Sequence, residues 1–278
     1  MPDAAEPTSH TVEVGGMKLH YRDWGNEGAL PMVFLHGLGG ASGDWMRIAE
    51  SFRADYHVVA LDQRGHGESD HSADRAYSTD DFVGDLTGFA DALGFNRFAL
   101  CGHSMGGHNA IAFTARYPER IVCALANDIP PSMPNRASVE DRAAGFPDGQ
   151  HAVFATKDAW IDSLRPNAEF TSDAHLELMS ESRLKAVDGG FQRTSDTNVH
   201  IYWEPADLWD EAKAITRPIF FIRGGKSGVL DAATVQKMDM AIEPARSIGL
   251  EQSGHNTFFD MEEEWLSVAT QFFAAHSD

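Results

Sequence analysis

Short, continuous apolar runs alternate along this chain with segments of helical spacing. Runs such as Met32–Leu35 and Ile121–Asn127 are typical of strands buried on both faces, whereas Phe82, Leu86 and Leu93 fall on one face of a helix. This alternation predicts an α/β fold in which helices cover both faces of a mostly parallel sheet. With an opening hairpin included, eight segments read as strands: 11–15, 18–24, 32–35, 57–61, 98–102, 121–127, 219–222 and 247–250.

The alternation breaks down in the middle of the chain, from Pro130 to about Pro205. This stretch begins with several prolines and contains two predicted helices, at Ala152–Leu164 and Ala174–Val187. We therefore predict one α/β core domain made of residues 1–129 and 206–278. Residues 130–205 would form a helical cap inserted after the sixth strand.

A serine flanked by glycines lies between a predicted strand and a predicted helix. The segment Gly102-His103-Ser104-Met105-Gly106 fits the pattern G-x-S-x-G, which is weak evidence by itself. Its position strengthens it, because a tight strand-to-helix turn would expose the hydroxyl, and a Cβ at either glycine would crowd that turn. The alternative interpretation is a serine that merely caps the helix. We predict that Ser104 is a nucleophile.

A serine nucleophile needs a base and a site for the developing negative charge. In strand–serine–helix sites of this kind the base follows the last strand, and His255 occupies that place before the predicted terminal helix. We predict an oxyanion hole formed by the backbone N–H groups of Met105 and Leu38. Leu38 belongs to the glycine-rich segment after the third strand, which could otherwise be an ordinary turn.

Together these features resemble the α/β-hydrolase superfamily over essentially the whole chain. The resemblance is carried by His36-Gly37 after a strand, the segment Asp62–Ser69, the serine motif, and Gly254-His255. It is strongest to the branch of capped esterases, lactonases and carbon–carbon-bond hydrolases. The resemblance implies structural roles for Asp62 and Arg64. Dehalogenases and epoxide hydrolases of this fold use a carboxylate nucleophile, so the serine argues against those activities.

The sequence departs from this family at the acid of the triad. Members usually place it in the loop after the seventh strand, where this chain has Gly228. A glycine cannot orient an imidazole, so another carboxylate must do so. Asp128, at the end of the sixth strand, is the preferred candidate because some members of the superfamily carry the acid there. Asp231 is the alternative acid, and another carboxylate or a serine–histidine dyad remains open.

Composition and charge limit which binding partners and which cellular location are expected. The formal net charge of −20, from 42 acidic and 22 basic residues, disfavours binding to nucleic acid or anionic membranes. We expect a cytoplasmic location and a monomer or homodimer. We expect no cofactor and no bound metal, since no dinucleotide, phosphate-loop or zinc pattern occurs. The cysteines Cys101 and Cys123 lie in apolar runs and are expected to be buried free thiols.

The predicted function is hydrolysis of a small carboxylic ester or lactone, as in carboxylesterases, through an acyl-enzyme. The alternatives are a C–N or C–C bond hydrolase with the same triad, and a small-molecule receptor with a hydrolase-like site. Cap aromatics predict a largely apolar substrate pocket, and Arg183 and Arg193 are weaker candidates for binding a substrate carboxylate. The candidate aromatics are Phe146, Phe154, Trp160, Phe170, Phe191, Tyr202 and Trp203.

Overall fold

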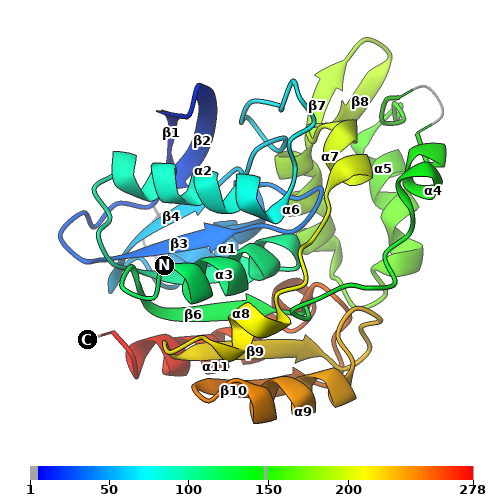
Figure 1. Ribbon diagram of the computed structural model, residues 1–278. Helices are drawn as coiled ribbons and strands as arrows, with labels where there is room; N and C mark the ends of the chain where they lie inside the picture. The colour runs from blue at the N-terminus through cyan, green and yellow to red at the C-terminus, as the bar shows by residue number, and fades with distance from the viewer. Residues whose placement is uncertain (1–5, 147–148, 278) are drawn as a thin grey trace.

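The centre of the molecule is a twisted eight-stranded sheet (Figure 1). We describe a computed structural model, which covers residues 6–146 and 149–277. The strand order is β1-β2-β4-β3-β5-β6-β9-β10, with β1–β2 and β2–β4 antiparallel and all other pairs parallel. The strands are β1 (Thr8–Val14), β2 (Met17–Asp23), β3 (Leu30–Leu35), β4 (Tyr56–Leu61), β5 (Phe98–His103), β6 (Ile121–Asn127), β9 (Ile219–Gly224) and β10 (Ala245–Leu250). The predicted α/β architecture is confirmed.

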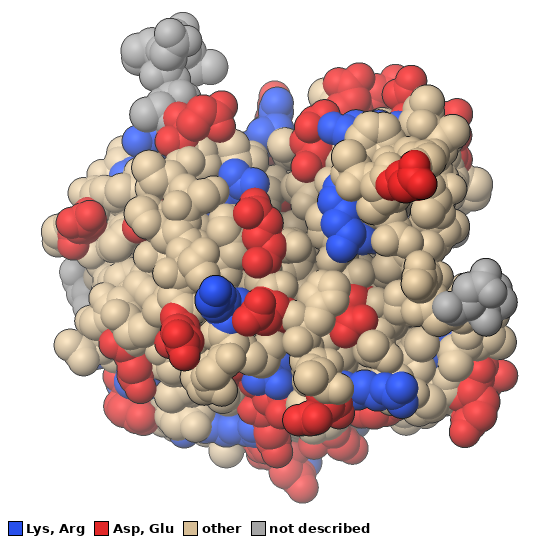
Figure 2. All heavy atoms as spheres, turned by 90° about the horizontal axis from the view of Figure 1, so that it is seen from above, with Lys and Arg blue, Asp and Glu red and all other residues tan. Residues whose placement is uncertain are grey.

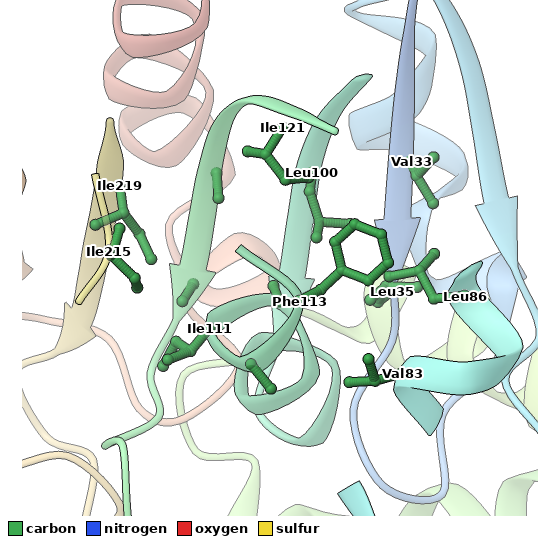
Figure 3. Close-up of a cluster of buried hydrophobic side chains, with 14 of the residues drawn as sticks. Val33, Leu35, Val83, Leu86, Leu100, Ile111, Phe113, Ile121, Ile215 and Ile219 are labelled. Atoms are coloured by element: carbon green, nitrogen blue, oxygen red, sulfur yellow. The ribbon is translucent and has the colours of Figure 1, made fainter. Parts of the chain in front are cut away.

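Helices cover both faces of this sheet because residues along each strand alternate between the two faces. Val33 and Leu35 belong to one hydrophobic core, and Met32 and Phe34 belong to the other. The first core is formed with α2 (Thr79–Ala92), α3 (Met105–Arg116), α8 (Trp209–Lys213) and α9 (Ala232–Ala241), and Figure 3 shows α2 and α3 side chains against β3 and β5. The second core is formed with η1 (Ser42–Trp45), α1 (Met46–Glu50), α10 (Thr257–Asp260) and α11 (Glu262–Ala274).

Most of the segment between β6 and α8 lies beyond the carboxyl ends of the parallel strands, toward which their arrows point in Figure 1. It contains α4 (Val139–Ala144), α5 (Lys157–Leu164), η2 (Arg165–Asn167), α6 (Asp173–Arg183), β7 (Leu184–Val187), β8 (Gly190–Arg193) and α7 (Thr197–Tyr202). The prediction of a helix over Ala174–Val187 is wrong in its last turn. The chain leaves the helix at Leu184 and forms a hairpin, because Gly189 and Gly190 adopt positive φ angles of 84° and 147°. The segment is therefore not purely helical, and its limits as a cap stay a prediction.

Two further sequence expectations concern the thiols and the surface. Cys101 and Cys123 are both free and buried, as predicted, and burial raises the pKa of Cys123 to about 12. In Figure 2, basic side chains are dispersed among acidic ones on the face seen, rather than gathered in one patch.

None of the helices in the described part of the chain is long and apolar enough to cross a membrane.

Candidate active site

The carboxyl ends of four parallel strands bring the predicted site residues to one edge of the sheet. Ser104 follows β5, Asp128 follows β6, and His255 lies in the loop after β10. The loop that contains Leu38 follows β3. Parallel strands end at the same edge, which is where open α/β sheets place their ligand sites.

Ser104 occupies a strained turn between β5 and α3. Its backbone has φ 51° and ψ −117°, a combination that a residue with a side chain rarely adopts and that costs about 1–3 kcal/mol. Two backbone bonds hold it there, from Ser104 N–H to Asn127 O (2.9 Å) and from His108 N–H to Ser104 O (2.8 Å).

The two glycines of the serine motif are required by this turn. A Cβ on Gly102 would lie 2.2 Å from the carbonyl oxygen of Gly106, and a Cβ on Gly106 would lie 2.4 Å from that of Leu35. Both are backbone atoms that cannot move aside. The packing of β3, β5 and α3 therefore excludes side chains here and leaves Ser104 partly exposed at the edge.

His255 and Asp128 are in direct contact. His255 Nδ1 lies 2.6 Å from Asp128 Oδ2, and the Asp128 side chain is fully buried. Asp128 also accepts hydrogen bonds from Gly224 N–H (2.9 Å, at Oδ1) and from the Ser227 hydroxyl (2.5 Å, at Oδ2). These donors fix the carboxylate, so Nδ1 of His255 is held as the protonated nitrogen and Nε2 is left as an acceptor.

In the part of the chain that the structure describes, no hydrogen bond joins the Ser104 hydroxyl to His255. Without a substrate, such bonds are often long or poorly aligned and tighten only in the reacting complex. The loop of His255 is nevertheless tied to the serine turn, because the ring of His103 donates from Nε2 to the carbonyl oxygen of His255 (3.1 Å). Burial, with a smaller effect of His255, lowers the pKa of His103 well below its ordinary value, so this ring is neutral.

The alternative acid, Asp231, lies elsewhere. It is exposed and caps α9 by accepting a hydrogen bond from Thr234 N–H (2.7 Å), a bond that lowers its pKa. A Cβ on Gly228, the residue at the position where the family resemblance leads us to expect the acid, would meet no described atom within 4 Å. The structure places Asp128, and not Asp231, against the imidazole.

Two buried histidines shape the loop that carries Leu38. His36 Nε2 accepts from Gln63 N–H and His66 Nε2 accepts from Gly39 N–H, each at 3.0 Å. Burial lowers the pKa of both rings, which keeps them neutral and able to accept. From the sequence, no role was predicted for these histidines, which lie in glycine-rich turns.

The N–H groups of Leu38 and Met105 donate to no other residue in the described part of the chain. Met105 is the first residue of α3, where an N–H has no partner within the helix. Both groups are free to bind an oxygen that develops negative charge beside Ser104.

Other polar residues support the site, and the sequence analysis missed most of them. Asp260 Oδ2 accepts from Gly254 N–H (2.8 Å), beside His255, and Ser227 precedes the glycine at the usual acid position. Asp62 is buried and accepts from Ser42 N–H (2.5 Å) and Glu68 N–H (2.9 Å). These Asp62 contacts join two loops and agree with a structural role.

Arg64 also makes contacts of a structural kind. Its guanidinium forms two bonds to the Asp85 carboxylate, at 2.5 and 2.7 Å.

Comparison with known proteins gives a family match over most of the chain. The family model described as the alpha/beta hydrolase fold matches residues 31–261. A 2-(acetamidomethylene)succinate hydrolase of Mesorhizobium japonicum is 27% identical over 234 residues, which are 82% of each chain. An N-formylmaleamate deformylase of Pseudomonas putida is 25% identical over 267 residues, covering 96% of this chain and 94% of that protein.

Solved structures agree with this match. The crystal structure of an E-2-(acetamidomethylene)succinate hydrolase superposes with a TM-score of 0.84. It covers 96% of this chain and 99% of its own, at 23% sequence identity. At that identity the likeness concerns the fold.

Proposed function

The chain belongs to the α/β-hydrolase family, and we propose that it hydrolyses a small carboxylic ester or lactone through an acyl-enzyme. The observation that carries this proposal is the buried Asp128 carboxylate, 2.6 Å from His255 Nδ1, at the edge where Ser104 is exposed. A carboxylate at Nδ1 makes Nε2 a proton acceptor, and a serine in a strained turn is the group such a base activates.

The proposed reaction has two stages. In the first, the Ser104 hydroxyl adds to the substrate carbonyl carbon while its proton passes to His255 Nε2, and the carbonyl oxygen takes the negative charge. The N–H groups of Leu38 and Met105 stabilise that charge, and Asp128 stabilises the imidazolium. The C–O bond to the leaving alcohol then breaks, and the alcohol takes the proton from Nε2.

In the second stage water repeats these steps. His255 takes a proton from water as the water oxygen adds to the acyl carbon, and Ser104 leaves with the proton that His255 returns. The products are the carboxylic acid and the free enzyme.

Hydrolysis of a C–N bond is a second candidate. Two relatives that align over most of both chains are named as a hydrolase of an acetamidomethylene compound and an N-formyl deformylase. The same residues would serve, because only the leaving atom changes from oxygen to nitrogen. An amine leaves less readily than an alcohol, so proton donation from His255 to the leaving group would then be more important.

The test is a substrate panel with the purified protein and its Ser104→Ala variant. Aryl esters of graded acyl length, lactones and N-acyl compounds are compared by kcat/KM, and a trapped acyl-enzyme is sought by mass spectrometry of the intact chain. The proposal expects ester or lactone turnover that Ser104→Ala abolishes, with the acyl mass on the Ser104 peptide. Selective turnover of N-acyl compounds would replace it by the second candidate. Binding without turnover of any compound would favour the receptor alternative.

A further inference from the structure

We propose that the substrate carries a carboxylate remote from the scissile bond, and that the guanidinium of Arg193 binds it. This deepens the proposed function and rests on it for the identity of the scissile bond. The inference comes from the arginines of residues 130–205, which differ sharply in what they contact.

Four of the five arginines in this segment are engaged by protein groups. Arg183 forms a bidentate ion pair with the buried Asp44 carboxylate, from Nε to Oδ1 at 2.9 Å and from Nη2 to Oδ2 at 2.8 Å. The others bind backbone carbonyls, carboxylates or both: Arg136, Arg142 and Arg165. Arg183, although also a sequence candidate for substrate binding, is therefore already paired.

The side chain of Arg193, at the end of β8, makes no hydrogen bond and no ion pair with any described residue, although its backbone pairs with Leu184 in the β7–β8 hairpin. Its guanidinium lies over the ring of the buried Trp160, 5.4 Å from the ring centroid. Its nitrogen atoms are nevertheless not sealed off by the protein, unlike Nε of Arg22. A mostly buried cation without an anion is costly, so an unpaired one near the loop that contains Leu38 indicates a charge that the ligand supplies.

The position of Arg193 connects it to the proposed oxyanion loop. Its Nη1 atom is 3.2 Å from the place where a Cβ would stand on residue 39, and His200 Cε1 is 2.9 Å from the same point. Gly39 is the neighbour of Leu38, whose N–H is a proposed oxyanion donor. A side chain at position 39 would fill this space, so the glycine keeps the approach from Arg193 to the loop clear.

In the described part of the chain, no carboxylate pairs with the positive charge of Arg193. Arg183 and Asp44 neutralise each other, while burial, together with Arg183, lowers the pKa of Arg193 to about 10, so it stays charged near neutral pH. Burial lowers the pKa of His200 to about 3 and that of His151 to about 4, so these rings are neutral. On a chain of net charge −20, the guanidinium of Arg193 is a local site for an anion.

A carboxylate suits this guanidinium better than a neutral polar group does. The planar guanidinium can donate two parallel N–H bonds to its two oxygens. The Ser195 hydroxyl lies 3.3 Å from His151 Nε2 and 3.0 Å from His200 Nε2, which adds hydrogen-bonding groups but no charge. The expected substrates are therefore monoesters, lactones or N-acyl derivatives of acids that keep a second, free carboxylate.

The experiment compares pairs of aryl esters with acyl chains of equal length, one ending in a carboxylate and one in a methyl group. Mono-p-nitrophenyl glutarate and p-nitrophenyl valerate are one such pair, with uncatalysed hydrolysis subtracted. The expected result is a preference for the anionic ester, expressed as a ratio of kcat/KM values. Arg193→Gln should lower that ratio by about 10- to 100-fold, mostly through KM, as loss of a charge-assisted hydrogen bond predicts. Arg193→Lys should recover part of it, since it keeps the charge but not the fork.

Two controls keep this result separate from folding and from the proposed chemistry. Arg165→Gln removes an exposed arginine of the same segment and should leave the ratio unchanged. Calorimetry of glutarate with Ser104→Ala, and with Ser104→Ala combined with Arg193→Gln, measures carboxylate binding without turnover. Binding that depends on Arg193 would support the carboxylate site even if no ester were hydrolysed. Equal ratios for parent and Arg193→Gln, with glutarate binding independent of Arg193, would overturn it even if esters were hydrolysed well.

Discussion

Replacing Asp128 by asparagine tests the triad in a way that the local hydrogen bonds make specific. Gly224 N–H donates to Oδ1 of Asp128, so the amide oxygen of an asparagine would take that position. The amide nitrogen would then take the place of Oδ2 and point its N–H toward His255 Nδ1. To accept that N–H, Nδ1 must lose its proton, which moves to Nε2. A ring protonated at Nε2 cannot accept the proton of Ser104.

The expected loss follows from this change of tautomer. Where an aspartate-to-asparagine change leaves the geometry intact but imposes the wrong tautomer, the rate falls by about 10⁴. That factor corresponds to about 5.5 kcal/mol in activation free energy. The side chain is fully buried and keeps its shape, so thermal unfolding should place the variant close to the parent. The measurement is kcat/KM on the best ester of the panel, and nitrogen NMR of the histidine rings reports the tautomer directly.

Asp231→Asn is the matched control for this change. It also removes one carboxylate charge, but at an exposed helix cap where the amide oxygen can still accept from Thr234 N–H. Its activity should remain within about threefold of the parent, far from the 10⁴ expected at Asp128. A loss smaller than about tenfold for Asp128→Asn, or a large loss for Asp231→Asn, would refute the assignment of the acid. The roles proposed for Ser104 and His255 would survive that outcome.

The remaining predictions concern the nucleophile, the serine turn and acid stability. Ser104→Ala should lower kcat by 10⁴ or more, an order of magnitude typical of triads, while calorimetry still detects ligand binding. Gly106→Ala should destabilise the fold by about 1–3 kcal/mol or more, because the added Cβ meets the backbone of β3. Gly84→Ala, on the exposed face of α2, should instead stabilise the fold by about 0.5–1 kcal/mol. Urea unfolding of both variants measures these changes. Burial lowers the pKa of His200 from 6.5 to about 3, so below pH 6.5 the ring binds a proton more readily in the unfolded state than in the folded state. The free energy of unfolding should therefore fall by about 1.4 kcal/mol per pH unit below 6.5. His200→Asn should flatten this decline in urea unfolding measured between about pH 7 and pH 4.5, and an unchanged slope would contradict the effect.

The core sheet was predictable from the sequence because its strands are buried on both faces. Continuous apolar runs such as Ile121–Asn127 have no polar face to obscure them, and their order along the chain is the order of the elements. The segment between β6 and β9 was less predictable. Leu184–Val187 continues a helical pattern, and only the positive φ angles of Gly189 and Gly190 turn it into a hairpin. The pair Asp188-Gly189 is a common signal for such a hairpin turn, and the helical pattern continued into Leu184–Val187 masked it.

The position of the acid could be inferred by elimination, but its support could not. Gly228 stands where the family resemblance leads us to expect a carboxylate, which directs attention to Asp128. That Ser227 and Gly224 donate to Asp128 depends on β6 and β9 being neighbours in the sheet, although more than ninety residues separate them in sequence. The segment that contains Gly228 thus supplies the donors that hold the carboxylate of Asp128.

Arg183 and Arg193 make the limit of sequence reasoning concrete. They are the same residue type, ten positions apart, on either side of one hairpin, and the sequence offers both equally as ligands for a carboxylate. What separates them is Asp44, which follows β3 and pairs with Arg183, whereas Arg193 has no carboxylate partner among the described residues. The free energy of a buried cation depends on whether an anion is near it, and that is fixed by tertiary contacts. Residues far away in sequence therefore decide whether an arginine is paired within the fold or is available to bind a ligand.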